Sequence, residues 1–162
     1  MSKKTKKIIA WSLVFIWFVF IFIMSNMNND DSNNKSINTL NKVVETTVNT
    51  TSELGITNEI STEEVQEIAI ELNWPFRKCM HSFVYCILIL LTLNAIRYSN
   101  LKTYQFYLDG FLISFFYSIF DEYHQTFVNG RNGQITDVLI DSIGIILGIL
   151  IYYFITKIKK ST

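Results

Sequence analysis

Side chains able to exchange protons or bind ligands recur at helical spacing along part of this 162-residue chain. Lys78, His81 and Tyr85 are separated by three and then four residues, so a helix would place them on one face. A histidine beneath a cation on the same stripe could transfer a proton or contact a ligand. The alternative is a structural histidine, satisfied by its neighbours on an otherwise apolar helix.

A second group, Asp121, Glu122 and Gln125, follows an apolar run directly. If the helix continues one turn beyond this run, the three side chains share one face. Adjacent carboxylates repel each other, and acids at the C-terminus of a helix oppose its dipole. They therefore need a compensating partner, and Arg131 and Lys78 are the nearest basic candidates along the predicted arrangement. A polar cap at the end of the helix is the alternative interpretation.

A third group combines two acids with two glycines. Asp137, Asp141, Gly144 and Gly148 occupy positions i, i+4, i+7 and i+11 of one predicted helix, so they form a single stripe. Glycines four residues apart let another helix approach closely. This stripe is therefore predicted to face the other helices, with Asp141 among them.

Together the groups hold more carboxylates than cations. At low dielectric this imbalance requires a shared proton, a protonated histidine or a bound cation, unless the groups form a purely structural ion-pair network. No short metal-ligand motif such as His-Glu-x-x-His is present, so we expect neither a metal site nor another cofactor. The candidates for a catalytic role are Glu122, His81, Asp121 and Asp137. The residues expected to contact a ligand are Lys78, His81, Tyr85, Asp121, Glu122, Gln125, Arg131, Asp137 and Asp141.

Four apolar runs must position these groups. Residues 8–24, 80–96, 104–120 and 138–155 are each about long enough to cross a hydrocarbon core of roughly 30 Å. The runs are apolar nearly all round, whereas helices of soluble bundles carry one apolar stripe. The sequence therefore predicts an all-α membrane protein with four transmembrane helices. The first run lacks a small-residue cleavage site and is interpreted as an uncleaved anchor.

The basic residues predict the orientation. With both termini in the cytoplasm, nine Lys and Arg residues lie inside and five outside, in the direction of the positive-inside rule. This topology divides the chain into a basic start and first helix (1–24), an extracytoplasmic acidic segment (25–76) and a core with three transmembrane helices (77–162). All the polar groups then lie on the outer side. The formal net charge is zero and no nucleic-acid motif is present.

The extracytoplasmic segment is predicted to be partly helical. Residues 26–34 are rich in Asn and Asp and are expected to be disordered. Residues 37–48 carry a weak amphipathic pattern, and Ser61 and Glu64 form a capping box that starts a helix ending at Pro75. Beyond it, Cys79 and Cys86 are too far apart on one helix for a disulfide, so they are expected to be free and buried.

The polar groups together resemble the VanZ-like family of small bacterial membrane proteins. The resemblance rests on Arg77-Lys78-x-x-His81-x-x-x-Tyr85, on Asp121-Glu122-x-x-Gln125 followed by Gly130-Arg131-x-Gly133 and Asp137, and on Asp141-x-x-Gly144-x-x-x-Gly148. It implies a multi-pass protein of the cytoplasmic membrane and, for some members, low-level teicoplanin resistance in Gram-positive bacteria. It implies no settled reaction.

Two functions follow as expectations. The first is a cell-envelope factor that limits the access of teicoplanin-like drugs to the outer leaflet, through the outward-facing polar site. The second is an enzyme acting on a phospholipid or a lipid-linked envelope precursor. In that case Lys78 and Arg131 would hold a phosphate or carboxylate, Glu122 would act as general base and His81 as general acid.

Overall fold

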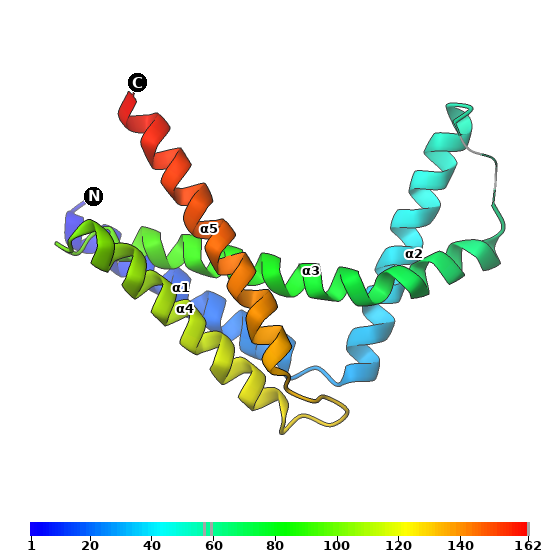
Figure 1. Ribbon diagram of the computed structural model, residues 1–162, viewed down its shortest axis with the longest axis horizontal. Helices are drawn as coiled ribbons and strands as arrows, with labels where there is room; N and C mark the ends of the chain where they lie inside the picture. Colours follow the sequence, from blue (N-terminus) through cyan, green and yellow to red (C-terminus); the bar gives the residue numbers. More distant parts are fainter. Residues whose placement is uncertain (57, 59, 162) are drawn as a thin grey trace. The chain divides into compact units, whose positions relative to one another are not determined.

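A computed structural model describes residues 1–56, 58 and 60–161 of the chain. Its helices are α1 (Lys3–Ser25), α2 (Asn29–Glu53), α3 (Thr62–Ile96), α4 (Thr103–Gln125) and α5 (Ile135–Ser161), drawn in Figure 1. No strand occurs among these described residues. The predicted all-α class is confirmed.

The chain forms two compact units. One, which we call the linker unit, comprises Asn28–Cys79; the other, the bundle unit, comprises Met1–Met27 together with the chain from Met80 onward. Helix α2 lies in the linker unit, while α1, α4 and α5 lie in the bundle unit. Helix α3 begins in the linker unit and ends in the bundle unit.

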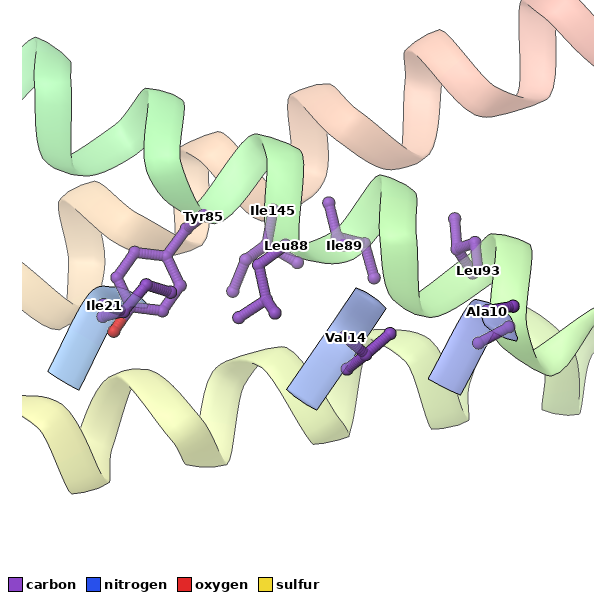
Figure 2. Close-up of a cluster of buried hydrophobic side chains, with 9 residues drawn as sticks. Ala10, Val14, Ile21, Tyr85, Leu88, Ile89, Leu93 and Ile145 are labelled. Atoms are coloured by element: carbon purple, nitrogen blue, oxygen red, sulfur yellow. The ribbon is translucent and has the colours of Figure 1, made fainter. Parts of the chain in front are cut away.

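The bundle unit has one continuous apolar core. Side chains from α1 and α3 meet there, as Figure 2 shows, and Ile145 joins them from α5. Aromatic residues of α4, including Phe111 and Phe115, pack against this core. The buried members are Ala10, Val14, Ile21, Tyr85, Leu88, Ile89, Leu93, Ala95 and Ile145.

Two side-chain hydrogen bonds fasten α1 to its neighbours. The Tyr117 hydroxyl of α4 donates to the Phe18 carbonyl oxygen at 2.6 Å, and the two rings stack with centroids 4.1 Å apart. On the other side, Trp17 Nε1 donates to the Val84 carbonyl oxygen of α3 at 3.1 Å. Both aromatic residues thus bury their rings while satisfying their polar atoms.

Helix α5 approaches α3 closely through its two glycines. A Cβ atom on Gly144 would overlap the backbone carbonyl of Ser82, and one on Gly148 would overlap the Ile89 side chain. The predicted packing of this glycine face against another helix is confirmed. The same contact brings Asp141, one turn before Gly144, into the bundle.

This contact makes Gly144→Ala strongly destabilising. The added methyl group meets backbone rather than a flexible side chain, so the two helices must separate. Overpacking of this kind costs about 1–3 kcal/mol or more. Thermal unfolding of the purified protein in detergent measures the effect. The control is Ile143→Ala on the exposed side of α5, and equal melting temperatures for Gly144→Ala and wild type would contradict the close approach.

Within the described part of the chain, three helices are long and apolar enough to cross a membrane: α1, α3 and α5. Helix α4 does not meet the same hydropathy criterion, although four crossings were expected from the sequence. Its apolar run contains several tyrosines and Asp109, which lower its mean hydropathy. Composition therefore supports a membrane protein with three clear candidate spans.

The start of the linker unit is helical, so the predicted disorder around Asn29 is wrong. Its amide side chains find partners across two helices: Asn73 donates to Asn33 and accepts from Ser36. Arg77 Nη2 donates to Asn29 Oδ1 at 3.2 Å. Composition alone could not reveal these partners, because they lie about forty residues away in the sequence.

The prediction that Pro75 ends a helix is also wrong, because α3 runs through it to Ile96. Proline removes only one backbone donor, and the turns on either side keep their own hydrogen bonds. The predicted capping box is confirmed at the start of this helix. The Ser61 amide donates to Glu64 Oε2 at 2.8 Å, and the Glu64 amide donates to Ser61 Oγ at 3.2 Å.

Both cysteines are free, as expected. The expectation that they are buried is wrong: Cys79 is exposed and Cys86 is partly exposed. Helical spacing excluded a disulfide between them, but it could not say which side of α3 faces the core.

Candidate functional site

Helix α4 buries its polar face and exposes its apolar one. Its buried residues are Gly110, Ser114, Ser118, Asp121, Glu122 and Gln125, which recur at helical spacing. Phe116 and Phe120 on the opposite face are at least half exposed. This is the reverse of a helix in a soluble bundle, and it places ionisable groups where they are costly unless they have a function or partners.

Polar residues of α3, α4, α5 and the α4–α5 loop form what we call the polar cluster: His81, Tyr85, Ser118, Asp121, Glu122, Gln125, Arg131, Asp137 and Asp141. Asp141 is a fully buried member of this cluster. Ser118 Oγ donates to its Oδ2 atom at 2.6 Å. Its Oδ1 atom accepts no hydrogen bond within the described part of the chain, and it lies 3.8 Å from Nδ1 of His81. The His81 side chain is 26% exposed, so solvent can reach the imidazole.

Gln125 connects the two adjacent acids of α4 to the loop that follows. Its Nε2 atom donates to Asp121 Oδ2 and to Glu122 Oε1, both at 3.2 Å. Its Oε1 atom accepts from Arg131 Nη1 at 3.2 Å. Through these hydrogen bonds, the Gln125 amide connects the Arg131 guanidinium to the buried carboxylates of Asp121 and Glu122.

The loop between α4 and α5 is held directly against the site. The Gln134 amide donates to Glu122 Oε2 at 3.0 Å, and Arg131 Nε donates to the Met27 carbonyl oxygen at 2.9 Å. Gly130 adopts a positive φ of 74°. At Gly133 a Cβ atom would overlap the Glu122 carbonyl oxygen, so only glycine permits this approach.

Tyr85 and Asp121 extend the cluster deeper into the bundle. Both are almost fully buried, and the tyrosine hydroxyl and the Asp121 Oδ1 atom make no hydrogen bond of normal geometry with described residues. The Tyr85 and Ser25 hydroxyls nevertheless contribute to the electrostatic environment of Asp121. Buried polar atoms without partners are uncommon in folded proteins and cost about 1–3 kcal/mol each.

Acidic groups dominate this part of the bundle unit. Asp121, Glu122, Asp137 and Asp141 are all buried. Asp137 stands in the first turn of α5, where the helix dipole favours an anion. The other three acids do not lie at the start of a helix. Arg131 and a protonated His81 would therefore neutralise their negative charge only in part.

One subset of the cluster has the composition of a metal site. His81, Glu122 and Asp141 each offer a ligand atom, and these atoms all lie within 4.8 Å of one another. They come from α3, α4 and α5 respectively. Nitrogen and carboxylate ligands of this kind bind zinc and related divalent metals in proteins.

Nine residues were predicted to contact a ligand, and the structure places eight of them in the bundle unit. Lys78 is the exception: it belongs to the linker unit, where its ammonium lies 5.9 Å from the centroid of the Trp74 ring. Sequence reasoning missed Ser118, which orients Asp141. Its position three residues before Asp121 on the buried face of α4 was the available signal.

Comparison with known proteins identifies the family of the chain. The family model described as VanZ/LLP1 matches residues 10–156, nearly the whole chain. No curated protein and no solved structure matches the chain. The match includes every residue of the buried polar cluster as well as α1 from residue 10 onward. The resemblance noted from the polar motifs is therefore confirmed, and the chain belongs to the VanZ/LLP1 family.

Proposed function

We propose that this protein lowers the susceptibility of a Gram-positive host to teicoplanin-like lipoglycopeptides through its buried polar cluster. The observation that carries the proposal is the concentration of carboxylates around Asp141, Asp121 and Glu122 inside an apolar helix bundle. Such groups are costly in a membrane and mark functional sites by default. Membership of the VanZ/LLP1 family supports the connection to lipoglycopeptides.

The proposed topology has four crossings, with α4 as the fourth. Its exposed aromatic face suits contact with lipid, and its polar face is buried. The excess of basic residues at the two termini and in the α3–α4 loop favours an inner location for them. The polar cluster and the linker unit then belong to the outer side, where lipid-linked envelope precursors are accessible.

Cysteine labelling tests this topology. On a background of Cys79→Ser and Cys86→Ser, we expect Asn33→Cys to react with a membrane-impermeant maleimide in intact cells. Ser99→Cys, in the α3–α4 loop, should react only after permeabilisation. The reverse pattern would put the linker unit in the cytoplasm and contradict an outward-facing site.

The chemistry of the drug explains the expected selectivity. Teicoplanin carries a fatty acyl chain that partitions into the outer leaflet, and each buried methylene group contributes about 0.8 kcal/mol. A protein that alters this leaflet or its lipid-linked precursors would act mainly on the acylated drug. Expression in a susceptible host, with inhibitory concentrations measured for teicoplanin and vancomycin, tests the proposal.

A membrane enzyme acting on a phospholipid or lipid-linked head group is the second candidate. The observation favouring it is the approach of His81 to Glu122, within reach of the loop that carries Arg131. Arg131 would bind an anionic head group, while Glu122 would accept a proton and His81 donate one. Lipid and cell-wall precursor composition, compared with and without the protein, distinguishes this candidate: an enzyme changes it and a passive factor does not.

A further inference from the structure

We infer that His81, Glu122 and Asp141 bind a divalent transition-metal ion of the zinc class. Their ligand atoms lie within 4.8 Å of one another. The centre of a triangle with sides of this length lies about 2.8 Å from each corner. Zinc bonds to nitrogen and oxygen measure about 2.0–2.2 Å, so each side chain needs to move inward by only roughly 0.7 Å. This inference does not depend on the proposed role in drug tolerance.

The surroundings of Asp141 independently favour a cation-binding site. It is fully buried, yet its Oδ1 atom accepts no hydrogen bond from any described residue. That atom faces Nδ1 of His81 at 3.8 Å, longer than a hydrogen bond. A carboxylate oxygen in this situation is a costly group by itself and a good ligand for an ion placed between it and the imidazole.

The surrounding residues hold two of the three ligands in place. Ser118 Oγ donates to the other oxygen of Asp141 at 2.6 Å, which leaves Oδ1 available. Glu122 is oriented by the Gln134 amide at 3.0 Å and by Gln125 at 3.2 Å. Hydrogen-bonded carboxylate ligands of this kind are usual in protein metal sites.

The ligand types select the class of metal. An imidazole with two carboxylates suits zinc, manganese or iron, whereas magnesium and calcium prefer oxygen ligands only. A divalent cation would also compensate the carboxylates that Arg131 balances only in part. Three protein ligands leave a coordination position open, and the partly exposed His81 gives that position access to solvent.

The competing explanation is a bare His81–Asp141 ion pair. It predicts no stoichiometric metal uptake and no stabilisation by metal. The two explanations therefore differ in measurements that do not involve any cellular activity.

The test uses the purified full-length protein in detergent, stripped with chelator and titrated with zinc chloride, manganese chloride or magnesium chloride. We expect about one zinc ion per chain by elemental analysis, and a zinc-dependent rise in melting temperature that magnesium does not reproduce. Asp141→Asn retains a carbonyl oxygen for the Ser118 bond and removes a buried charge, so the fold is expected to persist. Loss of a direct ligand should weaken zinc binding by at least about 100-fold, more than the loss of an outer-sphere partner.

The chain supplies a matched histidine control. His124 packs against Phe22, with ring centroids 4.5 Å apart, and does not belong to the ligand set. His124→Gln should bind zinc like the wild type, while His81→Gln and Asp141→Asn should lose both zinc and its effect on melting. Failure of the wild-type protein to bind zinc or manganese would overturn the inference. Equal losses in His124→Gln, or none in His81→Gln and Asp141→Asn, would assign the bound metal to adventitious sites and overturn it as well.

Discussion

Replacing Glu122 with Gln or Arg131 with Ala is expected to return teicoplanin susceptibility to that of cells without the protein. Glu122 accepts hydrogen bonds from Gln125 and from the Gln134 amide. Arg131 donates to Gln125 and to the Met27 carbonyl oxygen. Each substitution removes one charge from a cluster whose members depend on one another, so the whole site loses its arrangement. The readout is the inhibitory concentration of teicoplanin, with vancomycin measured alongside.

Protein abundance is the essential companion measurement. Removing one partner of a buried charged network costs about 3–5 kcal/mol, so Arg131→Ala tests folding as well as function. Arg131→Lys keeps the charge without the guanidinium geometry and should protect partially. Asp109→Asn, on α4 but outside the cluster, is the matched control and should protect fully. Full protection by well-expressed Glu122→Gln and Arg131→Ala would make the cluster purely structural.

A different outcome concerns the wild-type protein itself. If its expression changes the potency of neither drug, the resistance known for some family members does not extend to this chain. Lipid and precursor composition then becomes the decisive measurement, since the enzyme hypothesis predicts a change there without any effect on drug potency.

The second large effect is expected for Gly133→Ala. The added Cβ atom would overlap the Glu122 carbonyl oxygen and crowd the Thr126 methyl group. The loop must move away, and the hydrogen bond from the Gln134 amide to Glu122 is lost with it. Overpacking costs about 1–3 kcal/mol, and a hydrogen bond to a charged group contributes about 1.5–3 kcal/mol. Thermal unfolding and teicoplanin protection should therefore both decline.

Asn132→Ala provides the comparison for this loop. Asn132 is exposed and immediately precedes Gly133, so its truncation changes the loop composition without crowding α4. We expect its melting temperature to match the wild type. A Gly133→Ala protein that melts and protects like Asn132→Ala would show that the loop does not approach Glu122 as closely as described.

Helical periodicity predicted the site residues that share one helix. Asp121, Glu122 and Gln125 were expected on one face, and the structure buries all three. The alignment of Asp141 with Gly144 and Gly148 predicted an inward face, because close approach at the glycines carries the acid with it. These inferences succeeded because they need only the geometry of a single helix.

Other features depend on partners that are remote in sequence. The set of His81, Glu122 and Asp141 comes from three helices, so no short sequence motif could indicate the proposed metal site. The helical start of α2 depends on Asn73 and Arg77, and a search for local disorder signals cannot include them. In both cases the structure depends on tertiary contacts, which the local amino-acid composition does not reveal.

The reversed polarity of α4 has a consequence for how the protein is made. A segment with buried acids and a modest mean hydropathy enters a bilayer poorly by itself. Helix α1 is synthesised first and presents the Phe18 carbonyl oxygen that the Tyr117 hydroxyl will later occupy. In the proposed topology with four crossings, α1 would therefore assist the insertion of α4. A chain that loses α1 through truncation would leave the Tyr117 hydroxyl of α4 without this partner.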